Sequence, residues 1–207
     1  MEKKITKLIS LLDKAYPEAR IALRFKDPLQ LLVSTILSAQ CTDARVNIVT
    51  ETLFKKYRTA ADYARADIAE FERDIRSTGF YHNKAKNIIA AARMIVRDFA
   101  GRVPQTMEEM VLLPGVARKT ANVVLYNAFG RIEGIAVDTH VKRLSQRFGL
   151  SCHNDPAKIE QDLMRLIDKK LWGHITHLLI EHGRKVCDAK RPQCGACVIA
   201  GLCPSRT

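Results

Sequence analysis

Residues 112–124 read L-L-P-G-V-A-R-K-T-A-N-V-V, and after an apolar run residues 135–140 read I-A-V-D-T-H. The Pro114-Gly115 pair predicts a tight turn, because proline presets its own φ and glycine accepts a left-handed backbone. A helix is expected to begin near Arg118 and to end at Gly130. The segment therefore predicts a hairpin that leads directly into a helix.

Another helix is expected before this turn, which makes the whole segment a helix-hairpin-helix. Thr106 and Glu109 predict a capping box, since each side chain can satisfy an orphan backbone amide of the other residue. Amides at the start of the later helix lie at the positive end of its dipole, where a phosphate binds well. Lys119 falls in the first turn of that helix and can reach a group attached to the phosphate. The hairpin thus indicates chemistry on a nucleic acid.

The composition favours a polyanionic partner. The chain has 207 residues, with 34 Lys and Arg against 22 Asp and Glu, so its formal net charge is +12. A balance this basic favours DNA or RNA ahead of an acidic membrane surface, although a merely basic protein remains the simpler alternative. The first residues contain no secretory apolar segment, and no apolar run is long enough to cross a bilayer. We therefore expect a cytoplasmic, nucleoid-associated protein.

Helical spacing dominates the pattern of apolar residues, and no segment alternates with the period of two that a strand requires. Helix starts are expected at the pairs Asp27-Pro28 and Asp155-Pro156, because an acidic cap before a first-turn proline is a typical start. Further caps are expected at Thr42, Thr59 and Asp67, and stops at Gly79, Gly101, Gly130 and Gly149. About ten helices joined by short loops predict an all-α protein.

Two helical domains are expected. The capped helices of residues 22–133 form one continuous run that contains the helix-hairpin-helix at about 106–130. The amphipathic N-terminal helix is too short to form a core alone, so we expect it to pack with the helices after Asp138. The second domain would then be discontinuous, with residues 1–21 joined to 134–207.

Four cysteines crowd the end of the chain in the spacing C-x6-C-x2-C-x5-C, at Cys187, Cys194, Cys197 and Cys203. Structural zinc sites usually combine two C-x2–4-C pairs, and only Cys194–Cys197 fits that rule. Unequal intervals suit an iron–sulfur cube, since each thiolate must reach a different corner. We expect an iron–sulfur cluster ahead of zinc, with a disulfide third because a reducing compartment is expected.

Lys190 and Arg191 lie in the longest interval between these cysteines, on a loop held at both ends. Cations in fixed positions suit phosphate contact. A solvated basic loop is the equally weighted alternative.

Taken together, these motifs resemble the endonuclease III family of DNA base-excision glycosylases, within the helix-hairpin-helix superfamily. Residues 113–125 are similar to the family's hairpin, residues 137–140 to its catalytic acid segment, and the four cysteines to its 4Fe–4S site. Residues 31–43 and 77–88 look like its two loops that enter DNA. The resemblance implies an all-α fold of two helical lobes, a six-helix barrel-like domain and an iron–sulfur domain, with a DNA-binding cleft between them.

By this resemblance, Lys119 is the nucleophile. Its amine would attack C1′ of the damaged nucleotide, expel the base and leave a Schiff base, after which elimination of the 3′ phosphate nicks the strand. A free lysine titrates near a pKa of about 10.4, so its amine must be activated. Neighbouring Arg118, partial burial and the helix N-terminus are expected to favour the neutral amine.

Asp138 is implied to assist opening of the sugar and proton transfer. From the residues alone, Val-Asp-Thr-His before an amphipathic run is an ordinary helix N-cap. Both roles are compatible, because a capping carboxylate is held rigidly by its own helix. Without the resemblance, Lys119 would similarly be read as a phosphate contact.

The resemblance also implies contacts with DNA. An excised base must leave the duplex, and Gln40 matches the family residue that fills the vacancy, while Phe80 matches the opposing wedge. Alternatively, Gln40 is a polar residue at a helix end and Phe80 a core aromatic that could exchange roles with Tyr81. The remaining implied contacts are Gly115, Ala117 and Thr120 in the hairpin, together with Lys190 and Arg191.

Ala117 stands where the family often has a second glycine. A left-handed backbone there would cost on the order of 1 kcal/mol. The alternatives are that Ala117 adopts right-handed helical geometry or that phosphate binding is slightly weaker. We expect the first, because a helix that starts at Ala117 needs no positive φ.

The leading hypothesis is a monomeric, bifunctional glycosylase and apurinic/apyrimidinic (AP) lyase that acts on oxidised pyrimidines in duplex DNA. One alternative is a non-catalytic iron–sulfur protein that binds DNA or marks lesions. Another is a monofunctional glycosylase for mismatched or photodamaged bases, against which Lys119 counts. The short tail after Cys203 argues against the adenine-excising relatives, which carry an extra C-terminal domain.

Overall fold

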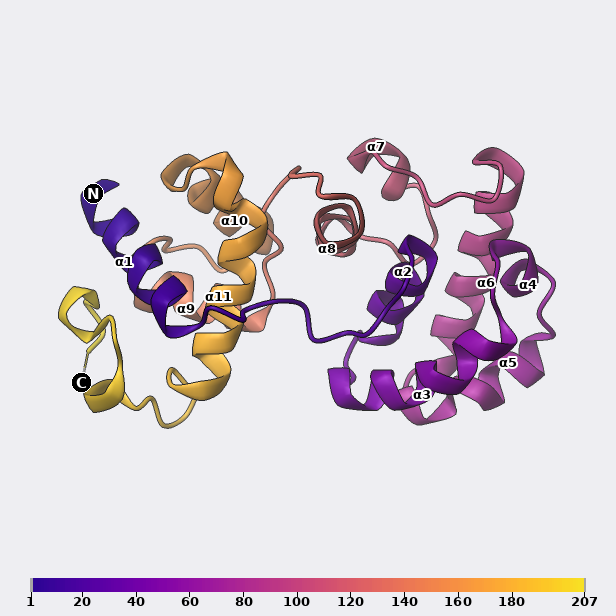
Figure 1. Ribbon diagram of the computed structural model, residues 1–207, viewed down its shortest axis with the longest axis horizontal. Coiled ribbons are helices and arrows are strands. Elements are labelled where there is room, and N and C mark those ends of the chain that lie inside the picture. The colour runs from indigo at the N-terminus through magenta and orange to yellow at the C-terminus, as the bar shows by residue number, and fades with distance from the viewer. Residues whose placement is uncertain (1, 207) are drawn as a thin grey trace. The chain divides into compact units, whose positions relative to one another are not determined.

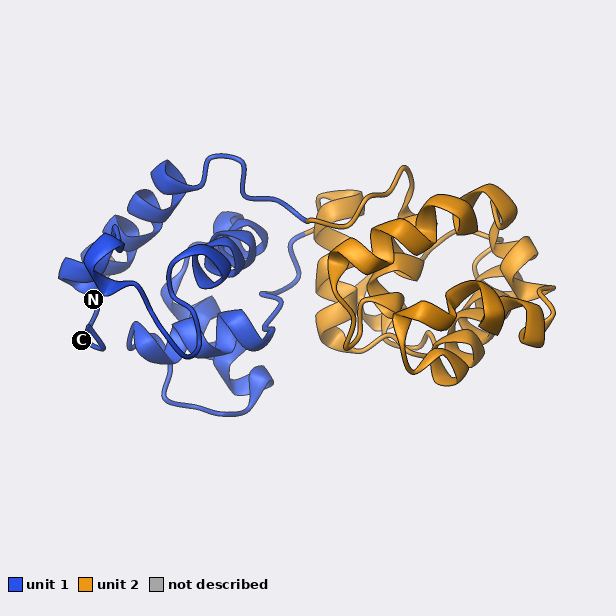
Figure 2. Cartoon of the chain, turned by 90° about the horizontal axis from the view of Figure 1, so that it is seen from below, with its two compact units in different colours: residues 1–21, 132–207 blue, residues 22–131 orange. Residues whose placement is uncertain are grey.

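The computed structural model of the chain describes residues 2–206 and is built from helices. Within that range it has eleven α-helices, four short 3-10 helices and no strand, so the all-α prediction is confirmed (Figure 1). The chain divides into two compact units, of which unit 1 comprises Met1–Ile21 and Ile132–Thr207 and unit 2 comprises Ala22–Arg131 (Figure 2). This division lies two residues before the expected boundary at 133/134.

Unit 2 is organised around α6 (Tyr81–Asp98), the longest of the described helices. Helices α4, α5 and α2 pack against α6, while α2 also packs against α3 and α8. Fully buried side chains at Leu31, Leu37, Phe71, Ile75 and Ile88 contribute to its core. The helices of unit 2 are α2 (Pro28–Leu37), α3 (Asp43–Lys56), α4 (Ala60–Ala64), α5 (Ile68–Ile75), η1 (Arg76–Thr78), α6 (Tyr81–Asp98), α7 (Met107–Met110) and α8 (Arg118–Phe129).

Unit 1 is organised around α11, which packs against α1 and α9. Its core includes Leu12 from α1, Leu144 from α9, Leu163 from α10, and Ile175 and Leu178 from α11. The N-terminal helix therefore buries its apolar face against residues more than a hundred positions away. The helices of unit 1 are α1 (Glu2–Ala15), α9 (Thr139–Arg147), α10 (Pro156–Leu166), η2 (Lys169–Leu171), α11 (Trp172–Lys185), η3 (Cys194–Ala196) and η4 (Ala200–Leu202).

The expected helix starts are confirmed by side-chain caps at Asp27, Thr42, Thr59, Asp67 and Asp155. The capping box expected at Thr106 and Glu109 is only half formed. The Thr106 hydroxyl accepts from the Glu109 amide at 3.3 Å, but that hydroxyl also donates to the Glu109 carboxylate at 2.9 Å. The Glu109 carboxylate thus accepts a hydrogen bond from the Thr106 hydroxyl, whereas in a capping box it would accept from the Thr106 backbone amide.

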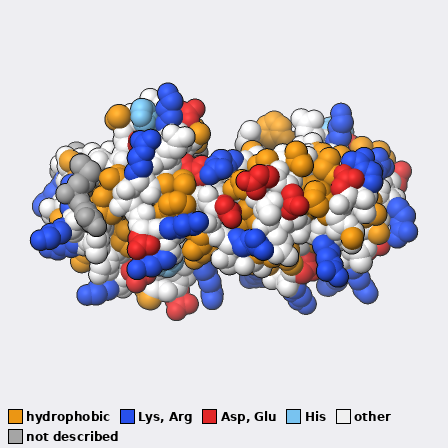
Figure 3. Space-filling view, turned by 90° about the horizontal axis from the view of Figure 1, so that it is seen from above, with side chains coloured by type: hydrophobic (Ala, Val, Ile, Leu, Met, Phe, Trp, Pro, Cys, Tyr) orange, Lys and Arg blue, Asp and Glu red, His pale blue; other side chains and the backbone are white. Residues whose placement is uncertain are grey.

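Basic side chains are spread over the visible face in Figure 3, with no single patch holding most of them. On this face the basic side chains mark no single site, so the site must be located from local geometry. Among the described residues, no helix combines the length and apolar character that a membrane crossing requires.

Candidate functional site

The hairpin of unit 2 is a tight turn seated on α6. The Val116 amide donates to the Leu113 carbonyl at 3.0 Å, with Pro114 and Gly115 at the two central positions. Gly115 has φ +79°, and a Cβ there would lie 2.8 Å from Cβ of Asn87 on α6. Glycine is needed both for the backbone conformation and for the close approach. The turn is therefore held in one orientation by α6.

Ala117 is the N-cap of α8 and adopts an extended conformation, with φ −87° and ψ 168°. The expected absence of a positive φ is confirmed, but the expected right-handed helical geometry is wrong, because the helix begins one residue later, at Arg118. An alanine N-cap contributes no side-chain hydrogen bond to the first turn. The start of α8 therefore lacks the side-chain acceptor that most helix starts have, which suits an anionic ligand.

Lys119 lies in the first turn of α8, and its side chain is exposed. The prediction that Lys119 is partly buried is therefore wrong, because the first turn of α8 lies at the surface. Thr120 is half-buried beside it. Two apolar side chains that the sequence analysis missed, Val111 and Leu112, are exposed just before the turn, Leu112 by 63%. The hairpin thus presents an amine, an uncapped helix start and apolar side chains on one short segment.

Gln40 and Phe80 each occupy a surface loop of unit 2 with a left-handed backbone. Their φ angles are +53° and +48°, and both side chains are exposed, Phe80 by 64%. The core alternative for Phe80 is therefore wrong. Tyr81 is half-buried and its ring lies 4.2 Å from that of His82, so Phe80 is the more available wedge of the two aromatics.

Asp138 belongs to unit 1, where it is the N-cap of α9. Its carboxylate accepts from the Val141 amide at 2.7 Å, and its backbone is extended. Nearby His140 is fixed by Nη2 of Arg143, which lies 3.2 Å from its Nδ1. A Cβ at Gly183 of α11 would come within 2.8 Å of the same Nδ1, so α9 and α11 meet closely at this point. Burial lowers the pKa of His140, which favours its neutral ring.

The four C-terminal cysteines line one cavity in unit 1. Cys187 is buried, and the other three cysteines are half-exposed. The four sulfur donors at unequal chain intervals fit an iron–sulfur cluster.

Arg147 of α9 supplies positive charge to this cavity. Its Nη1 donates to Sγ of Cys187 at 3.2 Å and to the Asp188 carbonyl at 2.7 Å, while Nη2 donates to the Ala189 carbonyl at 2.8 Å. The sequence analysis missed Arg147, because nothing in the local pattern links α9 to a loop 40 residues later. The guanidinium offsets thiolate charge and fixes the start of the loop.

The loop that carries Lys190 and Arg191 is internally bonded. The backbone amides of both residues donate to Oδ1 of Asp188, at 2.8 and 3.1 Å. These bonds lower the pKa of Asp188, which keeps the carboxylate charged and the turn closed. Both basic side chains are exposed. The cations therefore stand on a backbone whose start is held by Arg147 and Asp188.

His182 of α11 lies at the wall of the same region. Its Nδ1 is 2.8 Å from the Tyr16 hydroxyl, and its Nε2 is 3.5 Å from Sγ of Cys197. Burial lowers the pKa of His182 to about 4, so the ring is neutral near pH 7. The other two histidines of α11 lie elsewhere on the helix, with His174 paired to Asp13 at 2.7 Å and His177 buried.

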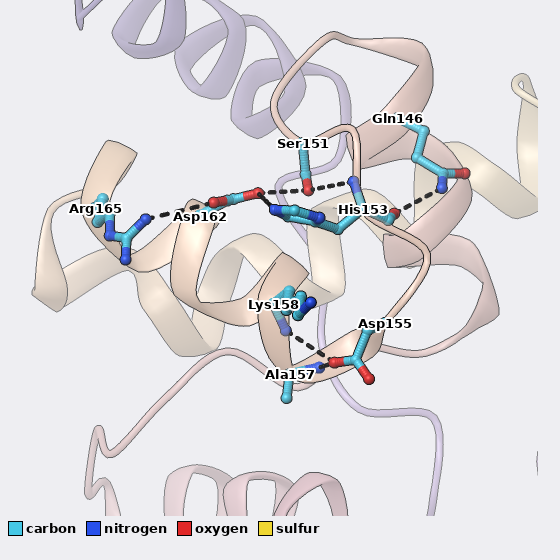
Figure 4. Close-up of polar contacts among 8 residues, drawn as sticks. All are labelled: Gln146, Ser151, His153, Asp155, Ala157, Lys158, Asp162 and Arg165. Atoms are coloured by element: carbon cyan, nitrogen blue, oxygen red, sulfur yellow. Dashed lines mark hydrogen bonds and ion pairs between the residues drawn. The ribbon is translucent and has the colours of Figure 1, made fainter.

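Ser151, His153 and Asp162 form a second polar cluster in unit 1 (Figure 4). The Ser151 hydroxyl donates to Oδ2 of Asp162 at 2.6 Å, and Nε2 of His153 lies 3.9 Å from the same oxygen. A nucleophilic relay would need the serine proton to pass to the histidine. Here the hydroxyl donates its hydrogen bond to the Asp162 carboxylate and none to His153, so the cluster fixes the loop that precedes α10.

The site residues are thus distributed over both units. Lys119, Gln40 and Phe80 belong to unit 2, whereas Asp138 and the cysteine cavity belong to unit 1. The cysteines were indicated by their spacing, while Gln40, Phe80 and the roles of Lys119 and Asp138 were implied by the family resemblance. Neither source indicated Arg147, Val111 or Leu112.

Comparison with known proteins adds two family matches. Residues 33–169 match the HhH-GPD superfamily of base excision DNA repair proteins, and residues 187–203 match the iron–sulfur binding domain of endonuclease III. The second match spans the four cysteines and the bonded loop between the first two.

Similar proteins include endonuclease III of Synechocystis, which is 55% identical over 99% of this chain and 93% of its own length, and endonuclease III of Bacillus subtilis, 45% identical over 97% and 92%. A solved non-covalent endonuclease III–DNA complex matches with a TM-score of 0.94 at 44% identity, covering 99% of this chain and 96% of the other. A trapped covalent endonuclease III–DNA intermediate matches with the same TM-score, identity and coverage.

Proposed function

The chain belongs to the endonuclease III family of base-excision DNA repair proteins, and we propose that it removes oxidised pyrimidines from duplex DNA and then nicks the resulting AP site. It is a DNA glycosylase and AP lyase that carries an iron–sulfur cluster. The observation that carries the proposal is the exposed Lys119 in the first turn of α8, directly after the turn at Gly115. We propose that the protein acts as a monomer on chromosomal DNA.

Lys119 is the proposed nucleophile. Its neutral amine attacks C1′ and the N-glycosidic bond breaks, so that the base leaves with the bonding electron pair and takes up a proton. The amine then forms a Schiff base with the opened sugar. Loss of a C2′ proton expels the 3′ phosphate by β-elimination, and water finally releases the enzyme. The uncapped start of α8 supports phosphate binding beside the reacting sugar.

Asp138 is the proposed acid and base. A carboxylate can stabilise positive charge that develops at C1′ and can move the proton that opening of the sugar requires. Its cap bond to the Val141 amide holds one carboxylate oxygen at 2.7 Å and so limits rotation of the side chain. A capped carboxylate keeps a fixed orientation without substrate, which is the preorganisation that catalysis needs.

Gln40 and Phe80 are the proposed wedges that fill the stack when the damaged nucleotide rotates out. Their exposure in two surface loops supports this role, and the aromatic ring of Phe80 offers a stacking face for an orphaned base. Val111 and Leu112 add apolar surface next to the hairpin. Unstacking costs a few kcal/mol, which these contacts would offset in part.

Borohydride trapping tests the proposed chemistry. Reduction should link the wild-type chain covalently to duplex DNA that carries an oxidised pyrimidine, and a panel of single-lesion duplexes should rank the substrates. Binding without excision or nicking would support a non-catalytic DNA-binding protein. Excision that leaves an intact AP site would support a monofunctional glycosylase.

The cysteine cavity makes a prediction of its own. When bound, the cluster would cross-link four thiolates within residues 187–203 and so hold this segment in one conformation. Cys194→Ser should lower the iron content and the visible absorbance of the purified protein and lower its melting temperature. Cys152→Ser is the matched control, because Cys152 is exposed and lies outside the cavity lining. Retention of full iron by the Cys194 variant would contradict the ligand assignment.

Lys190 is proposed as a phosphate contact, and salt titration tests it. Each neutralised phosphate contributes roughly 0.9 to the slope of log K against log salt. Lys190→Ala should therefore weaken binding to any duplex sequence and reduce that slope by about 1. Lys14→Ala, at an exposed lysine of α1, serves as the charge-matched control. Equal slopes of log K against log salt for wild type and Lys190→Ala would assign Lys190 to the solvated surface. The same measurement on Arg191→Ala tests Arg191.

A further inference from the structure

Lys84 is a buried lysine in unit 2 that the proposed chemistry does not use. It lies in the first turn of α6 and is only 5% exposed. Its Nζ donates to the Leu37 carbonyl at 2.8 Å and to the Thr78 carbonyl at 2.9 Å. Burial lowers the pKa of Lys84, which records the cost of keeping an ammonium group in this position. A costly buried group held by two bonds calls for a structural or functional reason.

The two carbonyls end different helices and begin the two wedge loops. Leu37 is the last residue of α2 and precedes Gln40 by three positions, while Thr78 is the last residue of η1 and precedes Phe80 by two. Carbonyls at a helix end carry partial negative charge and have no partner within the helix. One ammonium therefore bonds the starting points of both loops at once.

The same two loops hold unusual backbone conformations. Within the described residues, only Gln40, Phe80 and Ala100 combine a side chain with a positive φ. A left-handed backbone is strained at a residue other than glycine, so it persists only where surrounding contacts stabilise it. Two of these three residues follow, by three and two positions, the carbonyls that Lys84 binds. Lys84 is therefore placed to hold both loops in the conformation that exposes Gln40 and Phe80.

We propose that Lys84 is a positioning residue that joins the Gln40 and Phe80 loops into one rigid wedge for duplex DNA, a role that rests on the proposed function. Lysine suits this task, because three ammonium protons can serve acceptors that approach from different directions on a slender stem. Without it the loops would move independently, and each wedge would have to be ordered at the moment of DNA binding.

The test compares a reaction that needs the wedge with one that does not. Lys84→Met keeps the length of the stem and removes both hydrogen bonds. Excision from a single-lesion duplex should fall by about 100-fold, the scale of a small misplacement of reacting groups. Single-stranded DNA has no base stack in which a rotated nucleotide leaves a gap. The rate of AP-site cleavage in single-stranded DNA should therefore hardly change. Lys55→Met, at an exposed lysine of α3 in the same unit and outside both DNA-entering loops, is the matched control and should affect neither reaction.

A double-mutant cycle shows whether Lys84 acts through the wedges. In a Gln40→Ala, Phe80→Ala background, Lys84→Met should cost little further duplex excision, since coupled residues are not additive. Additive losses, equal losses on both substrates, or wild-type duplex activity in Lys84→Met would overturn the proposal. If Lys84→Met does not fold, as judged by circular dichroism, Lys84→Gln supports the same comparison. A wild-type chain inactive on both substrates would overturn the proposed function itself.

Discussion

Lys119→Gln should give no covalent adduct with damaged duplex DNA under borohydride, and strand nicking should fall on the order of 10⁴-fold. A glutamine amide cannot form a Schiff base with C1′, so the step that joins protein to DNA is lost. The substituted side chain is exposed in the first turn of α8, so the fold should be kept. The measurement is single-turnover nicking of a lesion duplex, with adduct formation followed by gel electrophoresis.

Binding provides the internal control for this variant. Lys119→Gln should still bind the lesion duplex, with affinity lowered by no more than a single lost charge contact, because the rest of the hairpin is unchanged. A full yield of adduct from Lys119→Gln would mean that another amine is the nucleophile. Mass spectrometry of the reduced adduct would then identify that amine directly.

Asp138→Asn should lower the rate of base excision by roughly 10²- to 10⁴-fold, the usual contribution of a positioned acid or base. Asparagine caps a helix as well as aspartate does, so the bond to the Val141 amide and the stability of α9 should remain. Loss of rate therefore reports the missing charge. Asp138→Ala, in contrast, should also lower the free energy of unfolding by about 1 kcal/mol, because the cap is removed.

Asp155 supplies the matched control. It caps α10 in the same way, accepting from the amides of Ala157 and Lys158 at 2.8 and 3.0 Å. Asp155→Asn should leave excision unchanged. If Asp138→Asn were as active as Asp155→Asn, the carboxylate at 138 would be a helix cap alone. Rates at a saturating concentration of lesion duplex and melting temperatures together separate the two roles.

Local sequence predicted the helix starts well. A cap is a bond between a side chain and a backbone amide two or three residues later, as Asp27 shows with the Gln30 amide at 2.9 Å. The turn at Pro114 and Gly115 was predictable for the same reason, since φ preferences belong to single residues. The cysteine spacing likewise indicated the cavity, because three short intervals keep four thiols close.

The predictions that were wrong concern residues whose local sequence is compatible with more than one conformation or hydrogen-bonding pattern. The Glu109 carboxylate accepts from the Thr106 hydroxyl, although the capping pattern equally allowed a bond to the Thr106 amide. Lys119 is exposed although partial burial was expected, because burial depends on what packs over the hairpin. Ala117 avoids a positive φ by adopting an extended conformation, which a shift of one residue in the helix start permits.

The sequence alone determined that the chain is all-α and where most helices begin, because these features depend on residue type and on neighbours a few positions away. The roles proposed for Lys119 and Asp138 come from the resemblance to the endonuclease III family, since the residues alone equally allow a phosphate contact and a helix cap. Only the tertiary structure decided that Phe80 is exposed and that Lys84 binds a carbonyl 47 residues distant. The bond from Arg147 to Cys187, across 40 residues, was likewise decided there. Such contacts arise when separate helices pack, and no local preference of either residue specifies its partner.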